Sequence, residues 1–230
     1  MQRYFVEQLN HEIIGSDAHH VLHVMRMKTG DEVIVCANKH CLLVNLQIRD
    51  GRVYYEILKE LEQTKSPHVT LIQGLPKHPK TETITKYATL FGVSHIVFVP
   101  MKRSIAKLDN EDHKLKRLHA IAKEASELAH RFDIPDIHFE QKVNQIAYQE
   151  FDILLLADEN EEKITLEEAL PSVQSDMKIG LIIGPEGGIA DEERLLYQSM
   201  NARTVSLGKN ILPTELASLY ALTYISLKNH

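Results

Sequence analysis

Two runs of almost uninterrupted apolar residues, DILLLA at 152–157 and IGLIIG at 179–184, constrain the fold of this chain most strongly. Such runs are typical of strands in a parallel sheet, because helices cover both faces of that kind of sheet. Strand-like and helix-like segments alternate around them from Pro67 onward, at 69–75, 81–91, 95–99, 112–131, 152–157, 166–170, 178–183, 191–200, 203–207 and 213–227. The pattern predicts an α/β domain over residues 68–230, with a ligand site beyond the carboxyl ends of its strands.

The first 67 residues follow a different pattern. Short strand-like segments at 3–6, 32–37, 42–49 and 53–61 are separated by turn residues, and Asp50 with Gly51 forms a two-residue hairpin signal. A short helix is expected at 17–27. We therefore expect a small β-barrel over residues 1–67.

Composition supports a folded globular protein, since 43% of the 230 residues are hydrophobic and 25% are charged. The chain has no apolar run of membrane-spanning length and no signal-peptide core near its N-terminus, so we expect a cytoplasmic protein without a membrane partner. Cys36 and Cys41 are too few for a disulfide framework, and we expect both to be buried thiols. His19, His20 and His23 cluster without a third ligand in view, so no metal site is predicted.

Charge is distributed unevenly. The formal net charge of −6 argues against a nucleic-acid partner, but residues 71–131 hold 11 Lys and Arg against 6 Asp and Glu. Affinity for phosphates follows local charge, so this basic segment could contact RNA. The alternative is a solvated, lysine-rich helix surface.

Two loops that follow predicted strands are candidates for binding a ligand. The first, GPEGG at 184–188, contains glycines that allow close approach of the backbone to a ligand. Asp191, Glu192 and Glu193 follow it at a predicted helix start, where their charges would repel a phosphate. The loop therefore favours a ligand without phosphates, such as a nucleoside or a cationic sulfonium. The second loop, LGKNILPTE at 207–215, also connects a strand to a helix.

These two loops carry a family resemblance. IIGPEGGIADEE, followed by VSLGKNILPTELASLYAL, resembles the cofactor-binding half of the SPOUT superfamily of trefoil-knotted methyltransferases. The chain is specifically similar to the RsmE family, which methylates N3 of a uridine in 16S ribosomal RNA of the small subunit. His20, the VMRM sequence at 24–27 and Gly30 with Asp31 match that family near the N-terminus.

The resemblance implies a fold, a cofactor and partners. It implies an α/β SPOUT-type trefoil-knotted parallel-sheet methyltransferase domain over 68–230, preceded by a PUA-like, RNA-binding β-barrel over 1–67. It also implies S-adenosyl-L-methionine as cofactor, 16S rRNA as substrate and a homodimer. The cofactor-binding residues that it implies are Leu156, Gly184, Pro185, Glu186, Gly187, Gly188, Leu207, Gly208, Ile211 and Leu212. The RNA-binding residues that it implies are Arg26, Lys77, Lys86 and Arg103.

The second loop departs from the family pattern, which is close to LG-x-RILR-x-ETA. Asn210 and Pro213 replace the two arginines, and Leu216 replaces the threonine. Backbone contacts to the cofactor can survive these changes, but the arginines suit the charge that develops when a uridine loses its N3 proton. An alternative function is therefore a catalytically impaired relative that binds cofactor or RNA. A nucleotide-phosphate enzyme is disfavoured, because the sequence lacks a P-loop lysine motif.

Three residues are the catalytic candidates that remain. Glu215 is the expected proton acceptor, although a carboxylate in a first helical turn can also simply complement the helix dipole. Thr214 is the expected hydrogen-bond partner, and Arg131 the charge stabiliser, with Arg103 as a second candidate for that role. Glu186 is expected to order its loop.

The C-terminal helix is apolar around most of its circumference. A helix on the surface of a monomer keeps one polar side, so Leu216, Leu219 or Tyr220 could supply a second buried surface, as two-fold pairing would provide. The alternative is a helix buried wholly within its own domain.

Overall fold

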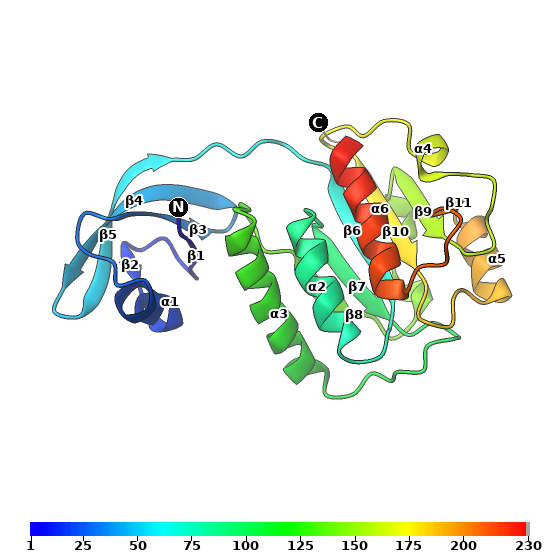
Figure 1. Ribbon diagram of the computed structural model, residues 1–230, viewed down its shortest axis with the longest axis horizontal. Helices are drawn as coiled ribbons and strands as arrows, with labels where there is room; N and C mark the ends of the chain where they lie inside the picture. The colour runs from blue at the N-terminus through cyan, green and yellow to red at the C-terminus, as the bar shows by residue number, and fades with distance from the viewer. Residues whose placement is uncertain (229–230) are drawn as a thin grey trace. The chain divides into compact units, whose positions relative to one another are not determined.

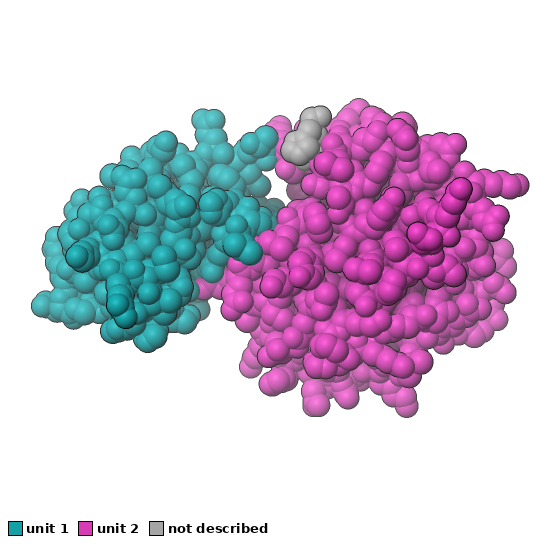
Figure 2. All heavy atoms as spheres, viewed as in Figure 1, with its two compact units in different colours: residues 1–64, 126–134 teal, residues 65–125, 135–230 magenta. Residues whose placement is uncertain are grey.

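The computed structural model describes residues 1–228 and divides into two compact units, which Figure 2 colours separately. Unit 1 consists of Met1–Thr64 together with Ser126–Ile134, and unit 2 contains the rest of the described chain. The sequence indicated a change of pattern near residue 67. Nothing in its local pattern indicated that Ser126–Ile134 would join the N-terminal unit.

Unit 1 is built on a curled five-stranded sheet with the strand order β1-β3-β4-β5-β2 (Figure 1). The strands are β1 (Arg3–Phe5), β2 (Glu12–Ile13), β3 (Glu32–Ala37), β4 (His40–Arg49) and β5 (Arg52–Glu60). Only the β1–β3 pair is parallel. The predicted hairpin turn between β4 and β5 is confirmed, since Asp50 and Gly51 both have positive φ, as a type I′ turn requires. The expected helix is divided into α1 (Gly15–His19) and a π-helical turn, η1 (His20–Val24).

Valine and leucine side chains from alternate positions of β3, β4 and β5 form the core of unit 1, with Tyr4 and Val21. His20 Nδ1 lies 3.0 Å from the Tyr4 hydroxyl, so this histidine has a partner within the unit. Within residues 1–228, no three His, Cys, Asp or Glu side chains gather closely enough to hold a metal ion.

The two cysteines correct one expectation. Cys36 and Cys41 are fully buried, but they form a disulfide and are not free thiols. They face each other directly across the β3–β4 ladder, with a Cα–Cα distance of 4.1 Å. The sequence argument considered only their number, whereas the pairing depends on the strand register that places them opposite each other.

Ser126–Ile134 completes unit 1 through contacts with β1. The backbone N–H of Phe5 donates to Glu127 Oε1 at 3.2 Å, and the Arg3 guanidinium lies 5.3 Å from the centre of the Phe132 ring. Phe132 also packs against the small cluster of Ile34, Cys36 and Cys41.

Unit 2 contains a six-stranded, fully parallel sheet with the order β11-β9-β10-β6-β7-β8. The strands are β6 (His68–Gly74), β7 (His95–Val99), β8 (Asp136–Phe139), β9 (Ile153–Ala157), β10 (Lys178–Ile183) and β11 (Arg203–Val205). The expected parallel sheet is confirmed, and all of its strands end at the same edge.

Helices cover the two faces of this sheet. They are α2 (Lys80–Leu90), α3 (Glu111–Leu128), α4 (Leu166–Ala169), α5 (Asp191–Ser199) and α6 (Thr214–Lys228), with short 3₁₀ turns at η2 (Val143–Gln145) and η3 (Tyr148–Glu150). Tyr197 of α5 packs on the face that carries Leu154, Leu156 and Ile182. Residues of the opposite parity, such as Leu155 and Leu181, are also fully buried, and α2 packs against α6 in front of the sheet (Figure 1). No helix within the described residues is both long and apolar enough to cross a membrane.

Candidate functional site

A cleft of about 1010 Å³ lies at the carboxyl edge of the parallel sheet. Three loops form most of its walls: the segment after β9, the GPEGG loop after β10, and the loop between β11 and α6. Because parallel strands all end at this edge, loops that are distant in the sequence converge here. The expected position of the ligand site therefore coincides with a cleft of unit 2.

The structure brings nine of the ten expected cofactor-binding residues to this cleft. The lining residues include Gly184, Pro185, Glu186, Gly187, Gly188, Leu207, Gly208, Ile211 and Leu212. Leu156 is the exception, because its side chain is fully buried in the core, although the next residue, Ala157, lines the cleft.

Two glycines of the first loop are required, Gly187 by close packing and Gly188 by its positive φ. A Cβ on Gly187 would lie 2.9 Å from Arg103 Cβ and 3.0 Å from Arg103 O. A Cβ on Gly188, whose φ is +70°, would lie 2.1 Å from Glu159 Oε1. Gly208 in the second loop has open space around it, but its φ of +113° is one that only glycine adopts readily.

Lys80 joins the two loops through a pair of carboxylates. Its Nζ lies 2.9 Å from Glu215 Oε2 at the start of α6 and 3.5 Å from Glu186 Oε1 in the GPEGG loop. The ion pair with Glu215 raises the pKa of Lys80. Burial raises the pKa of Glu186, but a hydrogen bond from the Lys77 backbone N–H and the charge of Lys80 bring it below its usual value. Glu215 is thus a neighbour of the cleft through Lys80 and is not itself one of the lining residues.

Thr214 connects the start of α6 to the first loop. Its hydroxyl donates to Gly184 O at 2.5 Å and accepts from Gln73 Nε2 at 2.8 Å. Gln73, at the end of β6, also donates to Gly184 O at 3.3 Å. Both side chains are buried, so this small network fixes the spacing between the GPEGG loop and the start of α6.

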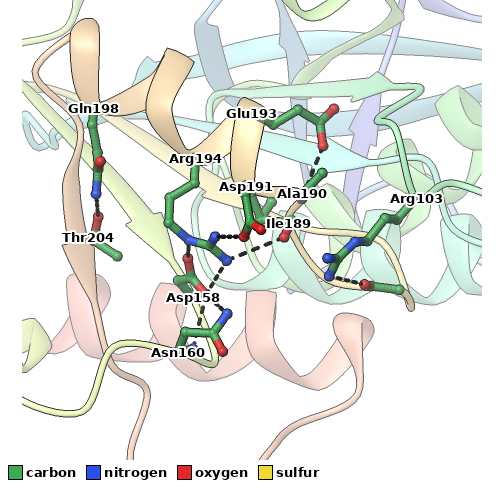
Figure 3. A network of polar contacts seen from close by, with 11 residues as sticks. Arg103, Asp158, Asn160, Ile189, Ala190, Asp191, Glu193, Arg194, Gln198 and Thr204 are labelled. Carbon is green, nitrogen blue, oxygen red and sulfur yellow. Dashed lines mark hydrogen bonds and ion pairs between the residues drawn. The ribbon is translucent and has the colours of Figure 1, made fainter.

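Arg194 of α5 joins the other side of the GPEGG loop to the segment after β9. Figure 3 shows its guanidinium directed at Asp158, Asp191 and the carbonyl of Ile189. Burial raises the pKa of Asp158, but hydrogen bonds from Arg194 and Asn160 outweigh that effect and bring the pKa below its usual value. The paired charges hold the segment after β9 against the loop after β10.

The carboxylates at the start of α5 all have partners. Glu193 accepts from the backbone N–H of Lys102 at 2.7 Å and of Ala190 at 3.4 Å. Glu192 pairs with the Lys102 side chain, and Asp191 pairs with Arg194. Arg103, which follows Lys102 in the chain, donates to Gly187 O at 3.1 Å, so it lies against the GPEGG loop (Figure 3).

The remaining predicted residues do not line this cleft. Lys77 and Lys86 are exposed in unit 2, and the Lys86 ammonium lies 5.8 Å from the Tyr87 ring centre. Arg26 is exposed in unit 1. Arg131 also belongs to unit 1, where it is paired with Asp133 at 2.8 Å, whereas Thr214 and Glu215 belong to unit 2.

Sequence reasoning missed Lys80, Gln73, Asp158 and Arg194. Their roles depend on contacts with residues far away in the chain, and no local motif marks them. One usable signal existed for Asp158, since it directly follows the buried strand β9 at the edge where ligand sites form.

Comparisons with known proteins agree with this geometry. Residues 63–226 match the model of the RNA methyltransferase domain family, and residues 13–40 match that of the RNA methyltransferase PUA domain. Ribosomal RNA small subunit methyltransferase E of Bacillus subtilis is 34% identical, over 98% of this chain and 96% of its own length.

Two solved structures show the same fold. A putative methyltransferase from Legionella pneumophila, in complex with S-adenosylmethionine, is 23% identical with a TM-score of 0.85, and 99% of this chain and 97% of that chain are covered. Ribosomal RNA small subunit methyltransferase E from Neisseria gonorrhoeae, bound to S-adenosyl methionine, is 22% identical with a TM-score of 0.83 at the same coverage.

A parallel sheet with glycine loops at its carboxyl edge, preceded by a PUA domain, defines the class as an RNA methyltransferase. Within that class, the similarity extends over nearly the full length of the chain and of its relatives. The chain belongs to the ribosomal RNA small subunit methyltransferase E family.

Proposed function

We propose that this protein transfers a methyl group from S-adenosylmethionine to N3 of a uridine in 16S rRNA. The observation that carries the proposal is the cleft formed by the GPEGG loop and the 207–215 loop in a chain of this family. Relatives named as methyltransferases over nearly the whole chain favour the active enzyme over a module that only binds cofactor or RNA.

The residues of the cleft fit this cofactor. Its volume lies at the upper end of the range for small-molecule sites, and the space beside Gly208 is open to a ligand. Five carboxylates line it, at Asp158, Glu159, Glu161, Glu162 and Glu186, which suits a cation better than a phosphate. When bound, S-adenosylmethionine supplies the methyl group from its positively charged sulfonium.

The nine lining residues named above are the proposed contacts for the cofactor. Thr214 and Gln73 keep the two loops at a fixed spacing, because their hydrogen bonds join Gly184 to the start of α6. The Thr214 hydroxyl already donates one hydrogen bond and accepts another, so we propose that it positions the loops.

Uridine N3 carries an imide proton and becomes nucleophilic only when that proton is removed. Glu215 is the proposed acceptor, because its carboxylate is held beside the cleft by Lys80. Arg131 remains a proposed charge stabiliser, and its substitution by glutamine should lower turnover without changing the affinity for the cofactor.

We propose that RNA contacts the PUA unit through Arg26 and unit 2 through Lys77, Lys86 and Arg103. Three of these side chains belong to the basic segment of 71–131, which contrasts with the acidic lining of the cleft. The contrast separates a surface for the RNA backbone from a pocket for a cationic cofactor.

We also propose a trefoil knot in unit 2, a cytoplasmic location and a homodimer. The family membership supports all three. Exposed apolar side chains on α6, which include Leu216 and Tyr220, support the dimer.

The decisive experiment adds the protein and methyl-labelled cofactor to small ribosomal subunits that lack the modification. We expect one labelled uridine in 16S rRNA, methylated at N3. A label on another base or on another ring position would contradict the substrate assignment, and cofactor binding without any transfer would favour the binding-module alternative.

A further inference from the structure

Lys80 occupies a special place in the wall of the cleft. Among the described residues that line it, only Lys80 and Lys209 carry a positive charge. Lys209 is exposed at the tip of the second loop, whereas the Lys80 side chain is 29% exposed and held between two carboxylates. Lys80 is therefore the cation whose position in the cleft the fold determines.

The two carboxylates come from different elements, so they hold Lys80 where the loops converge. Glu186 belongs to the GPEGG loop, and Glu215 lies in the first turn of α6, which packs against the helix of Lys80, α2. A neighbouring charged residue on α2 has other partners, because Glu82 pairs with Arg117 and with His78. Lys80 thus ties its helix to both cofactor loops at once.

We propose that Lys80 is a catalytic cation that stabilises the negative charge developing on the target uracil. This proposal rests on the proposed function and deepens it, since it supplies the charge that the second loop lacks at Asn210 and Pro213. A cation held in a partly buried site stabilises developing charge far better than one in bulk water.

In the proposed step, a proton moves from the uracil to Glu215, and the Lys80 ammonium exchanges Glu215 for the uracil as its anionic partner. The N3–H bond breaks, its proton passes to the carboxylate of Glu215, and the electron pair stays on N3 and spreads onto the two flanking carbonyl oxygens. Glu215 then carries no charge to hold Lys80, while the uracil carries one negative charge. Glu186 keeps the ammonium in place as its interaction passes from Glu215 to the imide oxygen.

The test compares Lys80→Met and Lys80→Arg with the wild type on unmodified small subunits. We expect Lys80→Met to lower kcat roughly 100-fold, as loss of one preorganised donor to a developing anion does, and Lys80→Arg to retain most activity. The rising limb of the kcat profile should move to higher pH by roughly 1–3 units in Lys80→Met, because the imide must ionise without a nearby cation. Lys178→Met is the matched control, since Lys178 is an exposed lysine at the opposite end of β10.

Subunits containing 5-fluorouridine separate this role from an indirect effect on Glu215. Fluorine withdraws electrons and makes the N3 proton more acidic, so it should restore much of the activity missing in Lys80→Met. If Lys80 only kept Glu215 and Glu186 in place, Lys80→Met would be equally slow on both substrates and its pH profile would not move. That result, or a kcat within about threefold of wild type, would overturn the proposal. A wild-type protein that methylates neither substrate would instead overturn the proposed function.

Discussion

Individual glycines in the cleft are needed for different physical reasons. Gly187 leaves room for the backbone and side chain of Arg103, while Gly208 adopts a backbone conformation that a Cβ disfavours. Sequence inspection identified both as candidate ligand contacts, because each follows a strand. It could not tell which glycine is needed because a neighbour lies close and which because of its backbone φ, since the neighbours are known only from the structure.

Both Gly187→Val and Gly208→Val should weaken binding of S-adenosylhomocysteine. The first displaces Arg103 and the second shifts the backbone of its loop, so both move groups that line the cleft. Titration calorimetry measures the effect. Gly51→Ala is the control, because Gly51 also has a positive φ, in a unit 1 turn, and its substitution should lower stability without changing affinity. Normal affinity in both loop variants would show that the cofactor binds elsewhere.

Arg194→Met should destabilise unit 2 by about 3 kcal/mol at pH 7, because it leaves the buried carboxylate of Asp158 without its ionic partner. In the wild type the pKa of Asp158 is lowered, so its contribution is present above the unfolded-state pKa and disappears as pH falls through the folded value. In the variant, burial without the arginine should raise that pKa. Urea unfolding should therefore show a difference between the two proteins that shrinks on acidification, and a constant difference would argue against this account.

At the scale of elements, strands buried on both faces were the most predictable part of the chain. The expected and observed bounds agree for β3, β7 and β10, where apolar side chains determine the strand. β2 has only two residues, and β8 is an edge strand that pairs only with β7, so neither leaves a strong periodic pattern. The ion pairs of Lys80 were equally invisible, because they join residues 80, 186 and 215 through the topology of the sheet.

The prediction about the oligomeric state concerns helix α6. Leu216, Tyr220 and Leu227 are 48%, 54% and 66% exposed, although the helix also buries Ala221, Leu222 and Ile225. Tyr220→Asp should therefore convert a dimer to a monomer and weaken cofactor binding, since α6 begins at the end of the 207–215 loop, a proposed cofactor contact. Sedimentation at several micromolar concentrations measures this. A wild-type mass of 26.3 kDa throughout would refute the dimer.

At the scale of the whole molecule, we expect the separation of charge to govern RNA binding. Reversing the charges of Lys86 and Arg103 should weaken binding and reduce its dependence on salt, by about one unit of slope for each phosphate that the protein no longer neutralises. Filter binding between low and moderate salt measures the slope, with Lys178→Glu as the control. An unchanged slope would show that the basic segment is a solvated helix surface that does not contact RNA phosphates.

The composition of unit 1 has a consequence for how the protein is made. Its first 64 residues leave the ribosome early, but Phe132 and Glu127, which contact β1 and the cysteine pair, are synthesised only after residues 65–125 of unit 2 have emerged. The N-terminal sheet must therefore wait with part of its apolar surface uncovered. The two units alternate along the chain, so unit 1 cannot complete its packing before part of unit 2 has been synthesised.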